Sequence, residues 1–78
     1  MICGRVIGQI WSSKRIETVP SGALLLIETD KGEQLVAFDP LGCAQGEAVL
    51  ITRGSTALGY FSDSKAAIDA LIIGSIDE

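Results

Sequence analysis

The sequence predicts a mostly β protein: a small five-stranded barrel with a short helix before its last strand. Apolar residues alternate with polar or small ones along several short segments, and residues typical of turns separate those segments. In the first segment Gly4 and Gly8 lie on the same side, as glycines do at the sharp bends of a small closed barrel. A chain of 78 residues suffices for one domain, which we expect to span residues 1–78.

Residues 2–12 are expected to form the first strand, because their side chains alternate with a period of two. The face that is small or apolar throughout should point into the barrel, so a larger side chain at Gly8 would damage folding. This face consists of Ile2, Gly4, Val6, Gly8 and Ile10. The opposite face is mixed, and its Ile7 and Trp11 would contact water in a lone subunit. We therefore expect both to contact another subunit.

The next two strands are expected to form a hairpin. Residues 13–22 are polar and end in turn residues, which predicts a loop. Residues 23–29 are mostly apolar and residues 33–39 return as a strand. Residues 30–32 between them form a tight turn, whose glycine can take a positive φ. Residues 40–46 should form the loop that follows the hairpin.

The rest of the chain is expected to add two strands and the helix. Residues 47–53 alternate as a fourth strand, and residues 57–64 follow no regular pattern. Residues 64–70 can form one or two helical turns, with Ser64 as their cap. Residues 71–77 are apolar on both faces, which predicts a last strand that must be paired or covered. Five strands and a short helix in this order suggest a partly closed barrel similar to an OB-fold.

The composition predicts assembly with other subunits. Hydrophobic residues make up 47% of the chain before its nine glycines are counted, whereas roughly 45–50% with glycine included is usual. A chain this short buries only about 60% of the surface of its unfolded state. We expect other subunits to cover the apolar surface that one small core cannot hide.

Charge and length exclude several classes of protein. Ten Asp and Glu residues against six Lys and Arg residues give a net charge of -4, which argues against broad contact with nucleic acid. No apolar run approaches the roughly 18–20 residues that span a bilayer, so we expect no membrane partner. We also expect no secretion signal, because no basic start precedes a long apolar stretch. Two distant cysteines, Cys3 and Cys43, are typical of reduced thiols in a cytosolic protein.

Catalysis, metal binding and a cofactor are all disfavoured, so we expect a protein that is not an enzyme. The chain has no His, which removes the usual base for a Ser or Cys nucleophile and a common zinc ligand. The isolated carboxylates of Asp39, Glu47 and Asp69 fit solvated or turn-capping roles better than a catalytic pair. The glycine loop 42–46 lacks the P-loop and dinucleotide-binding patterns, which favours a structural turn.

Two other functions remain open at this point. One is a single-stranded nucleic-acid-binding module, since OB-like barrels stack bases on exposed aromatic side chains beside a basic groove. Here Phe38 is expected to be buried, and the basic residues are scattered. The other is a redox or metal-binding protein that uses Cys3 and Cys43. Two cysteines per chain complete a four-ligand cluster only with the help of another subunit.

Four segments carry a resemblance to a known family. They are Gly4-Arg5-Val6-Ile7-Gly8 with the Ser-x-Lys/Arg region at 13–15, Leu24-Leu25-Leu26, the stretch Val36-Ala37-Phe38-Asp39-Pro40-Leu41-Gly42-Cys43-Ala44-Gln45-Gly46-Glu47-Ala48-Val49-Leu50, and Gly54-Ser55-Thr56-Ala57 followed by residues 67–77. In this order and spacing they resemble the bacterial microcompartment vertex proteins, the pentamer-forming shell family often called CcmL/EutN. The likeness covers nearly the whole chain.

The resemblance implies a structural protein in the shell of a microcompartment, in the bacterial cytoplasm. Such proteins form homopentamers that close the fivefold corners of a polyhedral shell, whose flat facets are hexameric shell proteins. A ring of identical subunits closes through head-to-tail contacts, so each subunit needs two different contact surfaces. The apolar surplus of this chain fits that requirement.

The pattern of faces supplies candidate residues for the subunit contacts. They are Ile7 and Trp11 on the first strand, Leu41 and Gly42 in the following loop region, and Ile72 and Ile76 on the last strand. By analogy with the family, Ser55 and Thr56 would line the central opening of the ring.

Overall fold

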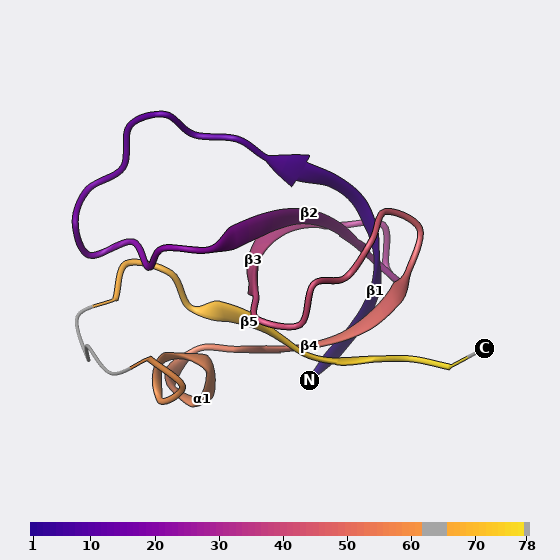
Figure 1. Ribbon diagram of the computed structural model, residues 1–78. Coiled ribbons are helices and arrows are strands. Elements are labelled where there is room, and N and C mark those ends of the chain that lie inside the picture. Colours follow the sequence, from indigo (N-terminus) through magenta and orange to yellow (C-terminus); the bar gives the residue numbers. More distant parts are fainter. Residues whose placement is uncertain (62–65, 78) are drawn as a thin grey trace.

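The strands of this chain close into a barrel. The computed structural model describes residues 1–61 and 66–77. It contains β1 (Ile2–Ile10), β2 (Ala23–Thr29), β3 (Gln34–Asp39), β4 (Ala48–Arg53), α1 (Ser55–Leu58) and β5 (Ala70–Ser75) (Figure 1). Within the described ranges, no helix is long and apolar enough to cross a membrane.

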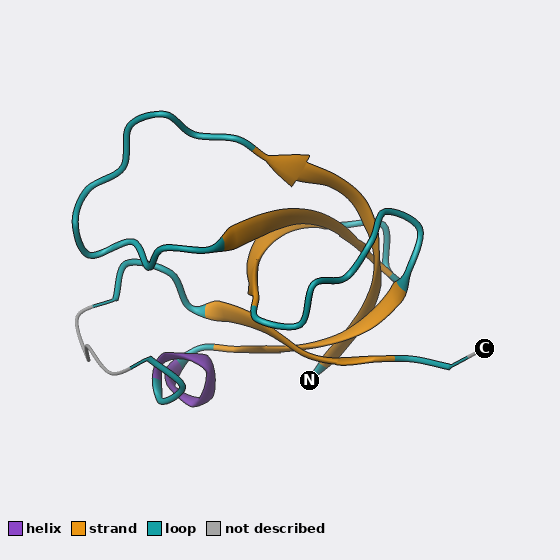
Figure 2. Cartoon of the chain, viewed as in Figure 1, coloured by secondary structure: helices purple, strands orange, loops and turns teal. Residues whose placement is uncertain are grey.

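The strands are hydrogen-bonded in the closed order β1-β2-β3-β5-β4, and they curve around a common centre (Figure 2). All neighbours are antiparallel except β3 and β5, which run parallel and pair at Phe38 and Leu71. The hairpin of β2 and β3 is confirmed, and Gly32 takes a φ of 82° in its turn. The predicted fold class, a small five-stranded barrel with a short helix before the last strand, is therefore confirmed.

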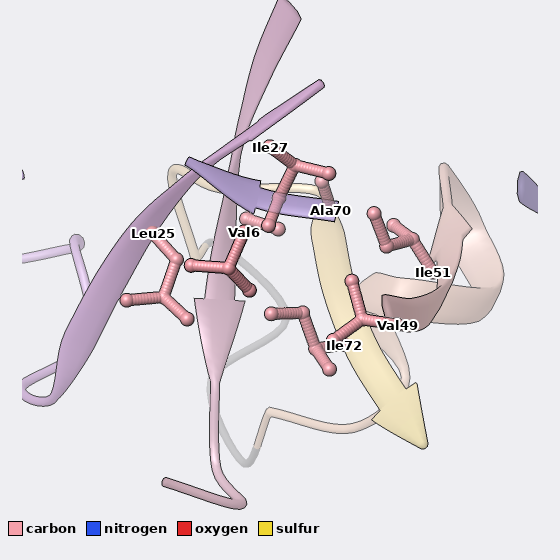
Figure 3. Close-up of a cluster of buried hydrophobic side chains, with 8 residues drawn as sticks. Val6, Leu25, Ile27, Val49, Ile51, Ala70 and Ile72 are labelled. Atoms are coloured by element: carbon pink, nitrogen blue, oxygen red, sulfur yellow. The ribbon is translucent and has the colours of Figure 1, made fainter. Parts of the chain in front are cut away.

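The interior of the barrel is filled by aliphatic side chains from all five strands (Figure 3). Ile27, Ile51 and Ile72 are completely buried there. The whole cluster consists of Val6, Leu25, Ile27, Ala37, Val49, Ile51, Ala70 and Ile72. Burying each of the larger side chains stabilises the fold by about 1.5–3 kcal/mol, so this cluster is the main source of the subunit's stability.

The two faces predicted for the first strand are confirmed as far as Val6. Val6 is 2% exposed inside the barrel, whereas Cys3 and Arg5 on the opposite face are exposed. Ile10, expected on the inner face, packs instead against the apolar cluster that includes Leu24 and Phe38. Trp11 follows the end of β1 and is 83% exposed. The period-two pattern therefore assigns inside and outside along the first half of this strand only.

The expectation for Gly8 is wrong, and Gly4 is the crowded glycine of β1. A Cβ added at Gly4 would lie 2.6 Å from Ile27 Cγ2 and 2.9 Å from the carbonyl oxygen of Glu28, whereas a Cβ at Gly8 would meet no atom within 4 Å. The register of β1 against β2 shifts between Val6 and Gly8. This irregularity changes the direction in which the following residues face, so Gly8 does not point into the packed interior.

A second apolar cluster covers the outside of the barrel. Leu24 and Phe38 pair across the hairpin, and Phe38 pairs with Leu71 on β5. These side chains and Ala57 of α1 are buried, with Val19, Phe61 and others packed against them. Part of the last strand's second apolar face, expected to need cover, is therefore covered by the chain's own loop and helix.

The short helix lies earlier in the sequence than predicted. It spans α1 (Ser55–Leu58), and the described part of the predicted segment, residues 66–70, is not helical. The proposed cap, Ser64, lies outside the described residues. The backbone of the predicted segment bonds to distant parts of the chain instead: the Ala67 amide donates to the Thr18 carbonyl, and the Asp69 carbonyl accepts from Gly54. Tertiary contacts override the local helix preference here.

The crowding at Gly4 predicts that the same substitution, glycine to alanine, changes the free energy of unfolding differently at Gly4 and Gly8. Gly4→Ala should destabilise the protein by ~1–3 kcal/mol, because the added methyl group overpacks against Ile27 and the backbone of β2. Gly8→Ala is the matched control and should be neutral or slightly stabilising, since its methyl group enters open space. Urea unfolding at a fixed chain concentration measures both, and equal stabilities for the two variants would contradict this reading of β1.

Candidate assembly surface

Apolar side chains on the outside of the barrel define its candidate contact surfaces. Trp11 is 83% exposed, and Ile16, in the same loop, is 66% exposed. Among the described residues, the exposed large hydrophobic side chains are Met1, Trp11, Ile16, Val36, Leu41, Tyr60, Ile73 and Ile76. Single exposed apolar residues are ordinary on any protein, so what matters is which of them the fold brings together.

The fold brings Ile7 and Ile76 together, although they come from opposite ends of the sequence. Both line a shallow hollow of about 390 Å³ on the outer face of β1. We call it the β1 hollow; it is lined by Cys3, Gly4, Arg5, Ile7, Glu28, Thr29, Asp30, Ala48 and Ile76. The Ile76 amide donates to the Ala48 carbonyl at 2.8 Å, which holds the segment after β5 beside β4. The hollow is thus partly apolar and is bordered by two carboxylates.

The second exposed apolar group lies beyond the other end of β1. Residues 11–22, which we call the Trp11 loop, project from the barrel on the side away from the two chain ends (Figure 1). The guanidinium of Arg15 donates to the carbonyls of Pro20 and Gly22, both at 3.3 Å. Val19 packs against the outer cluster. The loop is therefore anchored along its second half while Trp11 stays exposed.

Two carboxylates fix the loop over residues 40–46. Asp39 accepts hydrogen bonds from the amides of Leu41 and Cys43, at 2.8 and 2.7 Å. Glu47 accepts from the Ala44 amide and from the Ser75 hydroxyl, both at 2.9 Å. These bonds confirm the turn-capping role expected of both residues. They also lower the pKa of Glu47, through the backbone bond first and the Ser75 bond second.

The same loop presents Leu41 to the outside. Leu41 is 55% exposed, and the neighbouring Gly42 is exposed and takes a φ of 82°. A positive φ of this size favours glycine over residues with a Cβ. Both candidate contact residues therefore sit on the surface, held there by the bonds to Asp39.

The two cysteines lie in different environments, and both are free thiols. Cys3 is exposed in the β1 hollow. Burial and the nearby carboxylates of Asp39 and Glu47 raise the pKa of Cys43 to about 11, so this thiol stays protonated at neutral pH and is a poor nucleophile or ligand. Among the described residues, no group of three or more His, Cys, Asp or Glu side chains is placed to hold a metal ion.

The placement of Ile72 on an outward face is wrong. Ile72 is completely buried and belongs to the barrel interior, opposite Ile51 of β4. The register of β4 and β5 shifts between Leu50 and Ile51, and Ile73 is 41% exposed. The sequence 71–76 is apolar at nearly every position, so its pattern could not show which residues face outward.

Ser55 and Thr56 are both exposed at the start of α1, directly after Gly54.

The sequence pattern did not identify four of the exposed apolar residues, which are Ile16, Val36, Tyr60 and Ile73. Of these, Ile16 carried a usable signal, because it is an isolated apolar residue within a polar loop.

Comparison with known proteins identifies the family. Residues 1–77 match the family described as "Ethanolamine utilisation protein EutN/carboxysome". The chain belongs to the EutN/CcmL family. The bacterial microcompartment shell vertex protein GrpN of Rhodospirillum rubrum is 31% identical, over 99% of this chain and 93% of that protein. The carboxysome shell vertex protein CcmL of Gloeobacter violaceus is 35% identical, over 99% and 83% respectively.

Solved structures of pentameric microcompartment shell proteins have the same fold as this EutN/CcmL chain. The pentameric shell protein MSM0273 from the RMM microcompartment superimposes with a TM-score of 0.91 and 49% identity, covering 99% of this chain and 91% of that chain. The pentameric GrpN shell protein from Rhodospirillum rubrum gives a TM-score of 0.84 and 31% identity, covering 100% and 95%. The resemblance found in the four sequence segments is therefore confirmed.

The aromatic side chains of this EutN/CcmL chain give the nucleic-acid alternative no support. Phe38 is 8% exposed, as expected from its strand pattern. Its ring lies 5.2 Å from that of Phe61, which in turn lies 5.4 Å from that of Tyr60. Three of the four aromatic residues thus pack with one another, and the two exposed ones, Tyr60 and Trp11, lie on separate segments.

The burial of Ile72 and the exposure of Ile73 predict that alanine substitutions at these two positions lower the free energy of unfolding by very different amounts. Ile72→Ala should destabilise the protein by ~2–5 kcal/mol, because it leaves a cavity in the barrel interior. Ile73→Ala, the matched control, should cost far less, since its side chain is partly in solvent. Denaturant unfolding measures both. A larger loss at Ile73 than at Ile72 would overturn the assignment of inner and outer faces on β5.

The hydrogen bonds to Glu47 predict a pH-dependent contribution to stability. Because the folded-state pKa lies below the ordinary value of 4.5, the contribution is present above 4.5 and is lost as the pH falls through the folded-state value. Glu47→Gln should therefore lose less thermal stability than wild type on acidification. Glu17→Gln, which removes a charge from the exposed loop, is the control. The same acid-induced drop in Tm for Glu47→Gln and wild type would contradict this role.

Proposed function

We propose that this chain is a shell vertex subunit of a bacterial microcompartment. Five copies form a ring that closes a fivefold corner of the polyhedral shell. The role is structural rather than catalytic, and residues 1–78 act as one unit. The shell lies in the bacterial cytoplasm, and the outer edge of the ring meets hexameric shell proteins that form the flat facets.

The observation that carries this proposal is full-length similarity to proteins named as shell vertex or pentameric shell proteins. The chain's own surface supports it, because exposed apolar side chains lie both in the β1 hollow and on the Trp11 loop. A ring with rotational symmetry uses two different surfaces of each subunit. A flat hexagonal sheet closes into a polyhedral shell only if it contains fivefold points, and a pentamer can occupy such a point.

Ser55 and Thr56 are proposed to line the central opening of the ring. Both are small, polar and exposed at the start of α1. Their hydroxyl groups can donate and accept hydrogen bonds with water, so such an opening would be hydrated.

The mass of the protein in solution tests the proposed function. Light scattering should give a ring of five 8.2-kDa chains, about 41 kDa. Ile7→Asp, which puts a charge in the β1 hollow, should keep the barrel fold by circular dichroism but weaken the ring. A stable monomer, dimer or hexamer of the wild-type chain would contradict the vertex role. A fully pentameric Ile7→Asp protein would remove Ile7 from the interface.

A further inference from the structure

A closed ring requires that one surface of each subunit fit a different surface of its neighbour. We infer that the Trp11 loop of one copy inserts Trp11 into the β1 hollow of the next copy. This inference rests on the proposed function and adds to it which surfaces meet. The occupant of the hollow is thus a second copy of this chain.

The positions of the two surfaces fit head-to-tail assembly. The hollow begins at Cys3 near the start of β1 and extends to Ile7, and Trp11 follows the end of the strand. The nine residues of β1 extend over about 30 Å at roughly 3.3 Å per residue. The Trp11 loop and the chain ends lie on opposite sides of the barrel (Figure 1). A subunit with a protrusion at one end of a strand and a hollow at the other can repeat around a ring.

The chemistry of the two surfaces also matches. The hollow, of about 390 Å³, is lined in part by the apolar side chains of Ile7, Ala48 and Ile76. Burying a tryptophan there would remove about 150–250 Å² of mostly apolar surface from water. Arg5 also borders the hollow and donates to the Gly46 carbonyl at 2.7 Å. A guanidinium favours the face of an indole ring, so this charge does not oppose the insertion.

Opposite charges accompany the apolar match. Lys14, Arg15 and Glu17 follow Trp11 in its loop and give the loop a net charge of +1. The exposed carboxylates of Glu28 and Asp30 border the hollow. Seating Trp11 in the hollow would bring the basic part of one subunit towards the acidic part of the next. Such complementarity fixes the orientation of a contact and speeds association.

The fluorescence of Trp11 provides a direct test, because it is the one tryptophan of the chain. Emission and acrylamide quenching are measured across a dilution series of the wild-type protein, and light scattering gives the mass of each sample. We expect the rings to show emission at shorter wavelength and several-fold weaker quenching than the dissociated chains. Rings whose Trp11 is quenched as strongly as free tryptophan would overturn the inference and leave the pentamer intact. A chain that never forms rings would overturn the proposed function, and the inference with it.

Substitution of Trp11 tests the same contact independently of fluorescence. Trp11→Ala should raise the chain concentration of half-assembly at least ~30-fold, as expected for an interface hot spot. Trp11→Phe should recover part of this loss. Val36→Ala removes an apolar side chain that is 38% exposed on β3, outside the hollow and the Trp11 loop, and serves as the control. Circular dichroism checks that each barrel is folded. Unchanged assembly of a folded Trp11→Ala protein would overturn the inference.

Discussion

Closure of five short strands into one barrel is the constraint on which the rest of this structure depends. Neighbouring residues of a strand point to opposite sides, so a closed barrel hides only one of its two faces. Here the interior holds completely buried side chains such as Ile27, Ile51 and Ile72. The strands nevertheless carry apolar residues on their outer faces as well, and other parts of the chain cover several of these.

The chain covers part of its outer surface by itself. Leu24, Phe38 and Leu71 point outward from three neighbouring strands, and α1 and the Trp11 loop pack over them. This outer cluster also lies across the pairing of β3 and β5, which is joined at one residue pair. Packing here compensates for sparse hydrogen bonding, and the same packing anchors the loop that carries Trp11.

Polar side chains stabilise one loop on the surface of the barrel. Asp39 and Glu47 lie at the two ends of the loop over residues 40–46, and their carboxylates accept hydrogen bonds from its backbone amides. Ser75 joins Glu47 to the end of β5. These bonds fix the shape of the loop and keep Leu41 at the surface. The carboxylates of Asp39 and Glu47 therefore form hydrogen bonds with the backbone of this loop, as expected in a structural protein.

The amino-acid sequence by itself determined the strands, the hairpin, the inward position of Val6 and the family, because period-two patterns and turn residues act locally. Tertiary structure decided what such patterns leave ambiguous. Gly4 rather than Gly8 became the crowded position because β1 shifts register against β2. The described residues 66–70 are not helical because their backbone bonds to Thr18 and Gly54, and α1 spans residues 55–58 instead. Ile72 turned inward within a run that is apolar on both sides, where only neighbouring strands fix the face. The β1 hollow likewise exists because folding brings Ile76, after β5, to the surface that residues 3–7 of β1 line, and no local pattern encodes such a long-range arrangement.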